Sequence, residues 1–374
     1  MSAQRSGGIG HIVVIGGGVI GCAIAYELAK AGERVTLLER NALAQEASWA
    51  SAGIISSPSP GSGEFGLRSF RRYPALIAAV EETAGMRVGW NPTGETALIG
   101  ADNDPRPLQD LMEWQQRQGL HVEWLEGAAL REHEPVLSPH IQAAIYEWDA
   151  GSLRVHLLAQ ALARAATAHG ATIREHTAAL GLVTSGDRVT GVRTAEGEVG
   201  ADVVVLAAGA WSRALGELAG LNVPTMPVHG QMMALADPPI RLRTVVAGGG
   251  MYLLPRADGT IAVGATVDET GFAKRVTPQG IDELIGLVGR FAPSLNEARL
   301  VETWSGLRPG SADGAPIIGP APHCDGLWIA TGHYRGGALL AAMTSELVAA
   351  GIRSGTVDPL LAPFTPARFA PIGQ

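Results

Sequence analysis

The hydrophobic positions near the start of the chain follow a strand–helix–strand pattern. Residues 11–15 (HIVVI) form a β-branched run that is typical of a fully buried parallel strand. Apolar residues then recur at helical spacing over 20–28, and a second strand over 34–39 ends in the acidic residue Glu39. The pattern predicts a β-α-β unit of an α/β protein.

The turn between the first strand and the helix is rich in glycine. Residues 16–21 (GGGVIG) satisfy G-x-G-x-x-G, in which Gly16 makes a tight turn, Gly18 lets the backbone approach a pyrophosphate, and Gly21 permits close packing of helix on strand. The N-terminus of the helix offers unpaired N–H groups to phosphates. Glu39, 18 residues after Gly21, can accept hydrogen bonds from both ribose hydroxyls and repels a 2′-phosphate. The unit predicts a dinucleotide site and leaves NAD and FAD open.

Three further segments bear on the ligand. Residues 48–55 (SWASAGII) are small and lack periodicity, which suits a loop against a large flat ligand and equally an ordinary flexible loop. Residues 201–212 read as a buried strand ending in a glycine turn, after a β-hairpin over 181–199. A last strand leads into the glycine turn 332–337, which opens a helix whose N-terminus can stabilise negative charge on a reduced ring.

Length and charge narrow the function classes. A chain of 374 residues predicts two lobes, and short strands between glycine turns over 244–265 predict an antiparallel sheet in the second. The formal net charge of −8 argues against a general nucleic-acid binder. No apolar run of about 18 residues is present, so no membrane span is expected. Cys22 and Cys324 form no C-x-x-C pair or metal cluster, and without a visible signal peptide a reducing cytoplasm is the expectation.

The order of these motifs resembles the flavoenzyme group of glycine, D-amino-acid and sarcosine oxidases. The resemblance runs from about residue 11 to about residue 351, and bacterial glycine oxidases are the most similar members. It rests on residues 251–256 (MYLLPR), 304–310 (WSGLRPG) and 330–337 (ATGHYRGG). It implies FAD as the cofactor, bound noncovalently, because residues 305–318 lack the cysteine that attaches FAD in some members.

The resemblance also implies a discontinuous domain organisation. A Rossmann-like FAD-binding domain would comprise residues 1–85, 150–222 and 310–374, and a substrate domain on an antiparallel sheet would comprise 86–149 and 223–309. The implied cofactor-binding residues are Gly16, Gly18, Val19, Ile20, Gly21, Glu39, Arg40, Ala47, Ser48, Ala52, Gly53, Ile54, Ala179, Gly209, His333, Tyr334, Arg335, Gly336, Gly337, Ala338 and Leu339.

For the substrate, the resemblance implies a clamp on a carboxylate. Arg308 would bind it through a two-point guanidinium fork, Tyr252 would donate its phenolic hydrogen, and Arg335 would lie near flavin and substrate. Taken alone, Arg308 could tie down the turn before Pro309, and Tyr252 could be a core-edge tyrosine. His229 has no partner visible in the sequence and is interpreted as structural.

The implied reaction is oxidation of a small amino acid. Hydride would leave Cα for flavin N5, the imine would hydrolyse to a 2-oxo acid and ammonia or an amine, and O2 would become H2O2. Gly250 replaces a bulky polar residue found in some glycine oxidases, which widens the predicted pocket towards N-substituted glycines such as sarcosine or larger N-carboxymethyl amines. No metal site and no nucleic-acid or membrane partner are expected. Related oxidases often form tetramers, so a homo-oligomer stays open.

Three alternatives remain from the sequence. A dehydrogenase for D-amino acids or proline would pass electrons to a quinone or carrier instead of O2. An NAD-linked dehydrogenase is disfavoured, because it would leave residues 332–337 without a purpose. A noncatalytic flavin-binding or tRNA-modifying protein belongs to another class, and the absence of a basic patch argues against the RNA-directed form.

Overall fold

The first predicted strand lies inside a six-stranded sheet. The computed structural model describes residues 9–99 and 104–369, and the sheet has the order β18-β19-β12-β1-β2-β8. Its strands are β1 (His11–Ile15), β2 (Arg34–Leu38), β8 (Thr172–Arg174), β12 (Val203–Leu206), β18 (Ile317–Pro320) and β19 (Leu327–Thr331). All neighbours pair in parallel except β18 with β19. The predicted α/β class with a parallel cofactor sheet is confirmed.

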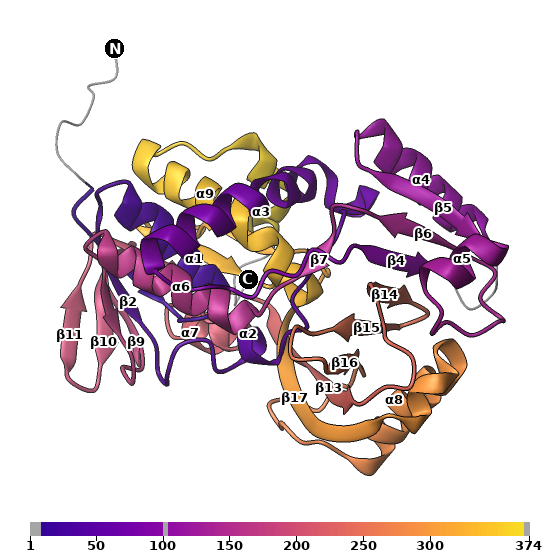
Figure 1. Ribbon diagram of the computed structural model, residues 1–374. Coiled ribbons are helices and arrows are strands. Elements are labelled where there is room, and N and C mark those ends of the chain that lie inside the picture. Colours follow the sequence, from indigo (N-terminus) through magenta and orange to yellow (C-terminus); the bar gives the residue numbers. More distant parts are fainter. Residues whose placement is uncertain (1–8, 100–103, 370–374) are drawn as a thin grey trace.

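Alternate residues of β1 enter two different cores, as the pleat of a strand requires. Ile12 and Val14 pack among the helices α1 (Val19–Lys30), α3 (Gly63–Ala84), α6 (Val155–Ala168) and α9 (Gly337–Ser354), which cover one face of the sheet (Figure 1). Val13 and Ile15 pack on the other side with the three-stranded sheet β9 (Gly181–Ser185), β10 (Arg188–Thr194) and β11 (Gly197–Gly200). The predicted hairpin over 181–199 is therefore a three-stranded meander.

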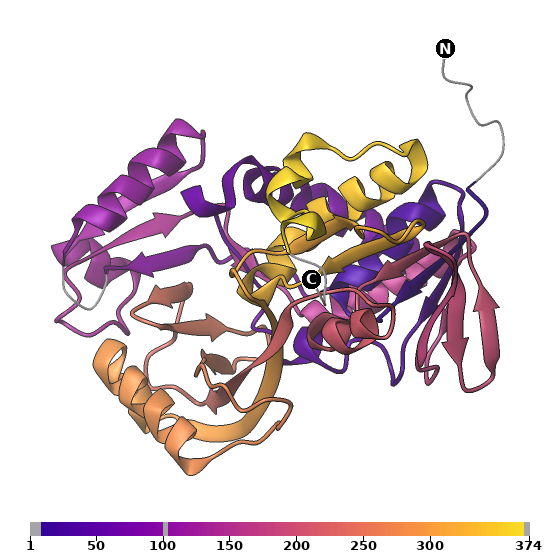
Figure 2. The same cartoon turned by 180° about the vertical axis from the view of Figure 1, so that it is seen from behind.

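A second sheet of eight strands has the order β17-β13-β16-β15-β14-β4-β6-β5 (Figure 2). Its strands are β4 (Glu95–Leu98), β5 (Val122–Glu126), β6 (Ala143–Glu147), β13 (Thr225–Ala236), β14 (Val245–Gly248), β15 (Met251–Pro255), β16 (Ile261–Gly264) and β17 (Arg299–Ser311). The expected sheet is antiparallel apart from one pair, because β14 runs parallel to β4. Helix α8 (Pro278–Phe291) packs on one face, where Met251 and Leu253 join its core.

The opposite face of this second sheet packs against residues 50–54, which lie on the same side of the molecule as the six-stranded sheet. Leu254 and Trp304 pack there against Ala50, with Tyr252 beside them, and the Trp304 indole N–H donates to the Ala50 carbonyl at 3.2 Å. Alternation along β15 thus gives one face to α8 and the other to the junction between the sheets. Polar side chains on this face therefore lie at the junction between the two sheets, where a ligand site can form.

The remaining elements are short. They are α2 (Ala47–Ala50), α4 (Arg106–Arg117), α5 (Gly127–His133), α7 (Ser212–Glu217), β3 (Ile54–Ile55), β7 (Gly151–Ser152) and the 3₁₀ helices Pro60–Ser62, Gly209–Trp211, Pro293–Glu297, Tyr334–Gly336, Pro359–Phe364 and Pro366–Arg368. Residues 48–55, read from sequence as an aperiodic loop, instead hold most of α2 and all of β3, which pairs with β7. Local propensity gave no sign of this, because the pairing partner lies nearly one hundred residues away along the chain.

Two other expectations concern cysteines and membranes. Cys22 is buried in α1, as expected, whereas Cys324, expected in a surface turn, is also buried and packs beside Leu327. In the described ranges, no helix combines the length and apolarity needed to cross a bilayer. Within the same ranges, no group of three or more His, Cys, Asp or Glu side chains could hold a metal ion.

Candidate active site

A cavity of about 350 Å³ opens at the carboxyl ends of the parallel strands. Ile15, Leu38, Ala207 and Thr331 line it from the ends of β1, β2, β12 and β19, the edge at which open α/β sheets bind ligands. The predicted cofactor residues that line it are Gly16, Gly18, Val19, Ile20, Glu39, Arg40, Ala47, Ser48, Ala179, Gly209, His333, Tyr334, Arg335, Gly337 and Ala338. Sequence segments far apart thus meet around one cavity.

Six predicted cofactor residues lie outside this lining: Gly21, Ala52, Gly53, Ile54, Gly336 and Leu339. Gly53 has a φ of +80°, and a Cβ there would approach the Leu153 carbonyl oxygen to 1.9 Å. The Leu339 carbonyl accepts from the Ser69 hydroxyl at 2.7 Å, which fixes the first turn of α9 to α3. Their role in cofactor binding stays a prediction.

The three fingerprint glycines have different reasons to be glycine. Gly16 has a φ of +111°, and a Cβ there would come within 2.5 Å of the Ala207 carbonyl oxygen. A Cβ on Gly21 would lie 1.9 Å from the Gly16 carbonyl oxygen, because helix and strand pack so closely. Gly18 has a φ of −78°, and its Cβ would meet only the Ser48 hydroxyl, at 3.4 Å. The protein itself therefore leaves Gly18 free to carry a side chain.

Charge around the cavity is asymmetric. The N-termini of α1 and α9 both border it, and neither helix has an acidic residue in its first turn. Glu39, at the end of β2, accepts from the Gly17 N–H at 2.7 Å and from the Asn41 N–H at 2.9 Å. These two amides fix the carboxylate at the cavity wall, with oxygen lone pairs left for a ligand. Glu46, a second carboxylate in the lining, is paired with Arg40 and Lys274. The helix dipoles favour an anionic ligand.

Arg308 is not among the residues that line the cavity, although its chain neighbours Leu307 and Pro309 are. Its Nη1 donates to the carbonyl oxygens of His229 at 3.3 Å and Thr266 at 3.1 Å. In the described part of the chain, no carboxylate lies within 4.0 Å of the guanidinium. Burial lowers the pKa of Arg308, an effect that Tyr252 opposes and the nearby Arg335 cation reinforces.

Tyr252 and Arg308 meet on one face of the second sheet. Tyr252 pairs with Gly264, and a Cβ on Gly264 would be 2.6 Å from the tyrosine ring, so the ring lies across that glycine. The Tyr252 hydroxyl contacts the Met232 sulfur at 3.4 Å and is within hydrogen-bonding reach of the Arg308 guanidinium. Burial raises the pKa of Tyr252, while Arg308 and Arg335 lower it. The three residues predicted to bind substrate are therefore brought together.

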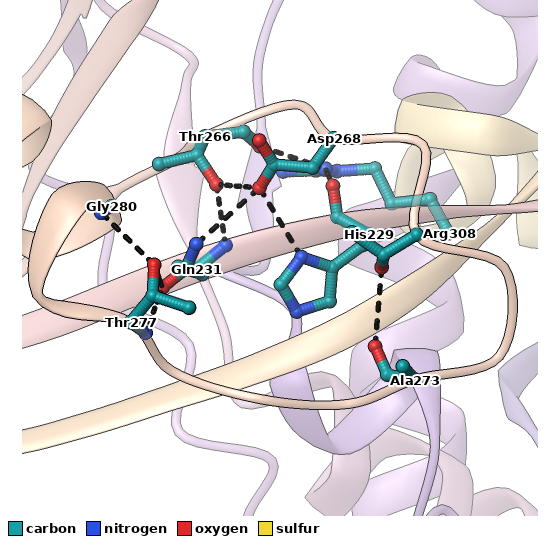
Figure 3. A network of polar contacts seen from close by, with 9 residues as sticks. His229, Gln231, Thr266, Asp268, Ala273, Thr277, Gly280 and Arg308 are labelled. Atoms are coloured by element: carbon teal, nitrogen blue, oxygen red, sulfur yellow. Dashed lines mark hydrogen bonds and ion pairs between the residues drawn. The ribbon is translucent and has the colours of Figure 1, made fainter.

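His229, for which the sequence offered no partner, has one in Asp268. The His229 Nδ1 and the Asp268 Oδ2 are 3.2 Å apart, and His229 is buried. Gln231 and Thr266 bind the same carboxylate, and the cluster lies beside the Arg308 side chain (Figure 3). The interpretation of His229 as structural did not include this network, because Asp268 lies 39 positions further along the chain.

Gly250 stands in the turn that joins β14 to β15, two positions before Tyr252. It is exposed, its φ is +89°, and a Cβ there would meet no atom within 4 Å. The neighbouring Gly249 differs, since its Cβ would strike the Phe291 ring at 2.2 Å. Open space therefore borders Gly250, which is not among the residues that line the cavity. The wider pocket stays a prediction.

A family model described as FAD dependent oxidoreductase, named DAO, matches residues 11–350. The chain belongs to this family.

Relatives within and around the DAO family cover the chain almost completely. Glycine oxidase of Pseudomonas aeruginosa is 38% identical over an alignment of 374 positions, which covers 97% of this chain and 99% of the relative. The crystal structure of glycine oxidase from Geobacillus kaustophilus superposes with a TM-score of 0.88 at 31% identity. The matched part covers 96% of this chain and 98% of the Geobacillus kaustophilus chain. Iminodiacetate oxidase from Chelativorans sp. BNC1 has a TM-score of 0.85 at 27% identity, with 95% and 98% covered.

The cavity fits the FAD of a DAO-family enzyme. Gly18 lines the cavity, and no neighbouring protein atom requires a glycine at this position. This indicates that the glycine is needed because a ligand closely approaches the protein backbone there. His333 is buried in the lining, its Nε2 pairs with the Thr344 hydroxyl at 3.0 Å, and its Nδ1 has no partner among the described atoms. Burial lowers the pKa of His333 to about 3, so the ring is neutral and offers a polar atom without charge.

Several lining residues were missed from the sequence. They are Ala44, Gln45, Glu46, Ser51, Val155, Ala178, Ala207, Ala208, Ala210, Trp211, Ala214, Leu215, Leu307, Pro309, Ala330 and Thr331, with Ile15 and Leu38 at the strand ends. Ala207 and Ala208 directly follow β12, and their position at the carboxyl edge was a usable signal. Others, such as Val155 in α6 and Leu307 in β17, lie within helices and strands. Trp211 is different, because the Arg40 guanidinium stacks on its ring at 3.8 Å, a contact that no local motif indicates.

Proposed function

We propose that this protein oxidises glycine or an N-substituted glycine at Cα, with O2 as the electron acceptor. The observation that carries the proposal is the Arg308 guanidinium, which has no carboxylate partner among the described residues and is held by two carbonyls near Tyr252 and the cavity-lining residue Arg335. A half-buried cation without a carboxylate from the protein favours a ligand that brings one. The similarity to glycine and iminodiacetate oxidases supports an amino acid as that ligand.

Arg308 orients the substrate by its carboxylate. Its Nη1 is fixed by the His229 and Thr266 carbonyls, so the rest of the planar fork meets the carboxylate in a set direction. Tyr252, kept protonated because burial raises its pKa, donates its hydroxyl hydrogen to the same group. These contacts place Cα rather than activate it, and positioning of this kind supplies much of catalysis.

The charges also select the protonation state of the substrate nitrogen. Arg308 and Arg335 are cations, and within the described residues neither forms an ion pair with an acidic side chain. Two cations next to the substrate disfavour its ammonium form, and the neutral amine can release a hydride from Cα. Held by the cavity's glycine turns and the N-termini of α1 and α9, FAD would supply the acceptor for that hydride and the route of the electrons to O2. The imine product hydrolyses to a 2-oxo acid and ammonia or an amine.

The size of the substrate follows from Gly250. The open space beside this residue supports N-substituted glycines as well as glycine, because a group on the nitrogen needs room that a bulky side chain would occupy. The likeness to an iminodiacetate oxidase supports the same class, because iminodiacetate is an N-carboxymethyl glycine. Sarcosine and larger N-carboxymethyl amines are therefore included in the proposal.

Noncovalent FAD and two lobes complete the proposal. Neither Cys22 nor Cys324 lines the cavity, which supports noncovalent attachment. The FAD-binding lobe would comprise residues 1–85, 150–222 and 310–374, and the substrate lobe would comprise residues 86–149 and 223–309. Of these, residues 1–8, 100–103 and 370–374 lie outside the described residues. The six-stranded sheet draws its strands from the first set and the eight-stranded sheet almost wholly from the second. A homo-oligomer and a cytoplasmic location stay predictions.

The test is a peroxide-release screen with the purified holoenzyme under air. The substrates are glycine, sarcosine, iminodiacetate, D-alanine and proline, with glycinamide as the control that lacks a carboxylate. We expect peroxide from the first three and little from glycinamide. Substrate-dependent reduction of a quinone dye without peroxide would reassign the acceptor, and no turnover of any amino acid would overturn the proposal.

A further inference from the structure

We propose that Asp268 is a positioning residue for Arg308, acting through Thr266 and His229. The inference rests on the proposed carboxylate-binding function of Arg308 and adds how the protein holds that side chain in place. Asp268 lies in the connection 265–277 between β16 and α8, outside the cavity lining. Because its carboxylate would not contact the substrate, Asp268 would affect substrate binding only through other residues.

The backbone of this connection is hydrogen-bonded to β13. The His229 N–H donates to the Asp268 carbonyl at 2.9 Å, and the Asp268 N–H donates to the His229 carbonyl at 3.0 Å. That His229 carbonyl also accepts from Arg308 Nη1. The second carbonyl that holds Arg308 belongs to Thr266, two residues before Asp268. One acceptor of the Arg308 guanidinium therefore belongs to residues 266–268, and the other, on β13, is hydrogen-bonded to them.

The Asp268 side chain fixes that segment. Its Oδ2 accepts from the Thr266 hydroxyl at 2.9 Å, from the Gln231 amide at 3.4 Å and pairs with His229 Nδ1 at 3.2 Å (Figure 3). The Thr266 hydroxyl in turn accepts from the Gln231 N–H at 3.0 Å. One carboxylate oxygen thus ties the connection to two residues of β13 that face away from Arg308. Hydrogen bonds to the Asp268 carboxylate lower its pKa against the opposing effect of burial, which keeps it charged.

The far end of the same connection touches the cavity wall. The Phe272 ring packs on Trp211, a lining residue, with ring centroids 5.2 Å apart, and Lys274 pairs with the lining residue Glu46 at 2.9 Å. The connection is therefore held at both ends, by Asp268 near Arg308 and by these contacts beyond it. Loss of the Asp268 carboxylate removes its bonds to Thr266, Gln231 and His229, so the Thr266 carbonyl is held less firmly. The backbone bonds between His229 and Asp268 and the outer contacts still keep the segment in place. Arg308 then samples more orientations at unchanged charge.

The experiment measures carboxylate binding to the FAD-loaded enzyme. Acetate is titrated against the visible flavin spectrum of wild type, Asp268→Ala and Asp268→Asn, and KM and kcat for glycine are measured alongside. We expect Asp268→Ala to weaken acetate binding and raise KM about tenfold, with a smaller change in kcat. Asp268→Asn should recover part of the loss, since its amide oxygen can accept the same bonds without the charge. FAD content and Tm should stay as in wild type.

Two comparisons separate this role from a merely structural one. Asp237→Asn removes an exposed carboxylate that pairs with Arg299 on the same sheet and should leave acetate binding unchanged. In an Arg308→Ala background, Asp268→Ala should have no further effect, because the group it positions is gone. Wild-type acetate affinity in Asp268→Ala, or an equal loss in the Arg308→Ala background, would overturn the inference. An Arg308→Ala enzyme with normal kinetics would instead overturn the proposed function.

Discussion

The guanidinium of Arg308 lies directly over Gly230, on the neighbouring strand β13. A Cβ on Gly230 would come within 2.3 Å of Arg308 Nη1 and 2.6 Å of Cζ. The backbone of Gly230 is not in the left-handed region, so only the space it leaves explains why a glycine is needed there. A residue without a side chain thereby sets where the cation can lie.

Gly230→Ala should weaken substrate binding while leaving the charge of the site intact. The added methyl group displaces the flexible end of Arg308 rather than the backbone, so we expect a fold close to wild type and a KM for glycine raised about tenfold, since a loss of about 1.4 kcal/mol corresponds to that factor. Steady-state kinetics and thermal unfolding measure the two effects. Gly286→Ala, an open helical position in α8, is the matched control. Unchanged KM in Gly230→Ala would show that Arg308 does not need its present position.

The fingerprint glycines should divide into ligand and packing roles. Gly18→Ala should fold with a wild-type Tm yet retain little FAD, because only a ligand requires the space beside that residue. Gly21→Ala should lower stability by about 1–3 kcal/mol through the clash with the Gly16 carbonyl. Flavin content and thermal unfolding of the apoprotein distinguish the two. A Gly18→Ala protein purified with full flavin would contradict the assignment of the pyrophosphate to this turn.

Glu95 and Glu147 form a buried carboxyl pair directly opposed across β4 and β6. Glu147 accepts from the Gln115 amide at 2.8 Å and the Ser57 N–H at 2.9 Å, whereas Glu95 Oε2 has no partner among described atoms. Burial and the neighbouring Glu147 charge raise the pKa of Glu95 to about 8 from an ordinary 4.5. The folded protein thus binds this proton more tightly than the unfolded chain does.

Stability should therefore fall with rising pH over this range. The contribution of Glu95 is complete below pH 4.5 and is lost as the pH rises to about 8. In Glu95→Gln the decline of Tm between these values should largely disappear, since the amide stays neutral. Unfolding curves across the range, with exposed Glu64→Gln as the control, make the comparison. Parallel Tm profiles for wild type and Glu95→Gln would mean that the pair shares no proton.

The nitrogen side of the substrate should be permissive. If the space beside Gly250 accepts an N-substituent, kcat/KM should rise from glycine to sarcosine and N-ethylglycine by about 0.8 kcal/mol per buried methylene. Gly250→Asn should reduce that gradient, and asparagine tolerates the positive φ better than most residues. Its flavin content should be unchanged. A flat series in both proteins would place the N-substituent elsewhere and favour glycine as the substrate.

The local parts of this architecture were predictable from sequence. The β-α-β unit over 11–39 carries its own periodicity and glycines, so its strands, helix and turn agree with the structure. The contacts that complete the site are not local. His229 finds Asp268 only because β13 and the 265–277 connection run side by side, and Glu95 opposes Glu147 only through the register of β4 and β6. A one-residue shift in either pairing would turn these side chains to opposite faces. Their partners lie far apart along the chain, so the local pattern around each residue did not reveal the contact.

The most direct test of the central claim is anaerobic reduction of the bound flavin by substrate. Holoenzyme is mixed with glycine or sarcosine without O2, and the visible absorbance of oxidised flavin is followed in wild type, Arg308→Lys and Arg308→Ala. We predict full bleaching in wild type, and in Arg308→Ala a substrate affinity weaker by about 2–5 kcal/mol at normal flavin content. Arg308→Lys should recover part of it, because an ammonium cannot form the two-point fork. Flavin that stays oxidised in wild type, or bleaches equally well in Arg308→Ala, would contradict the account.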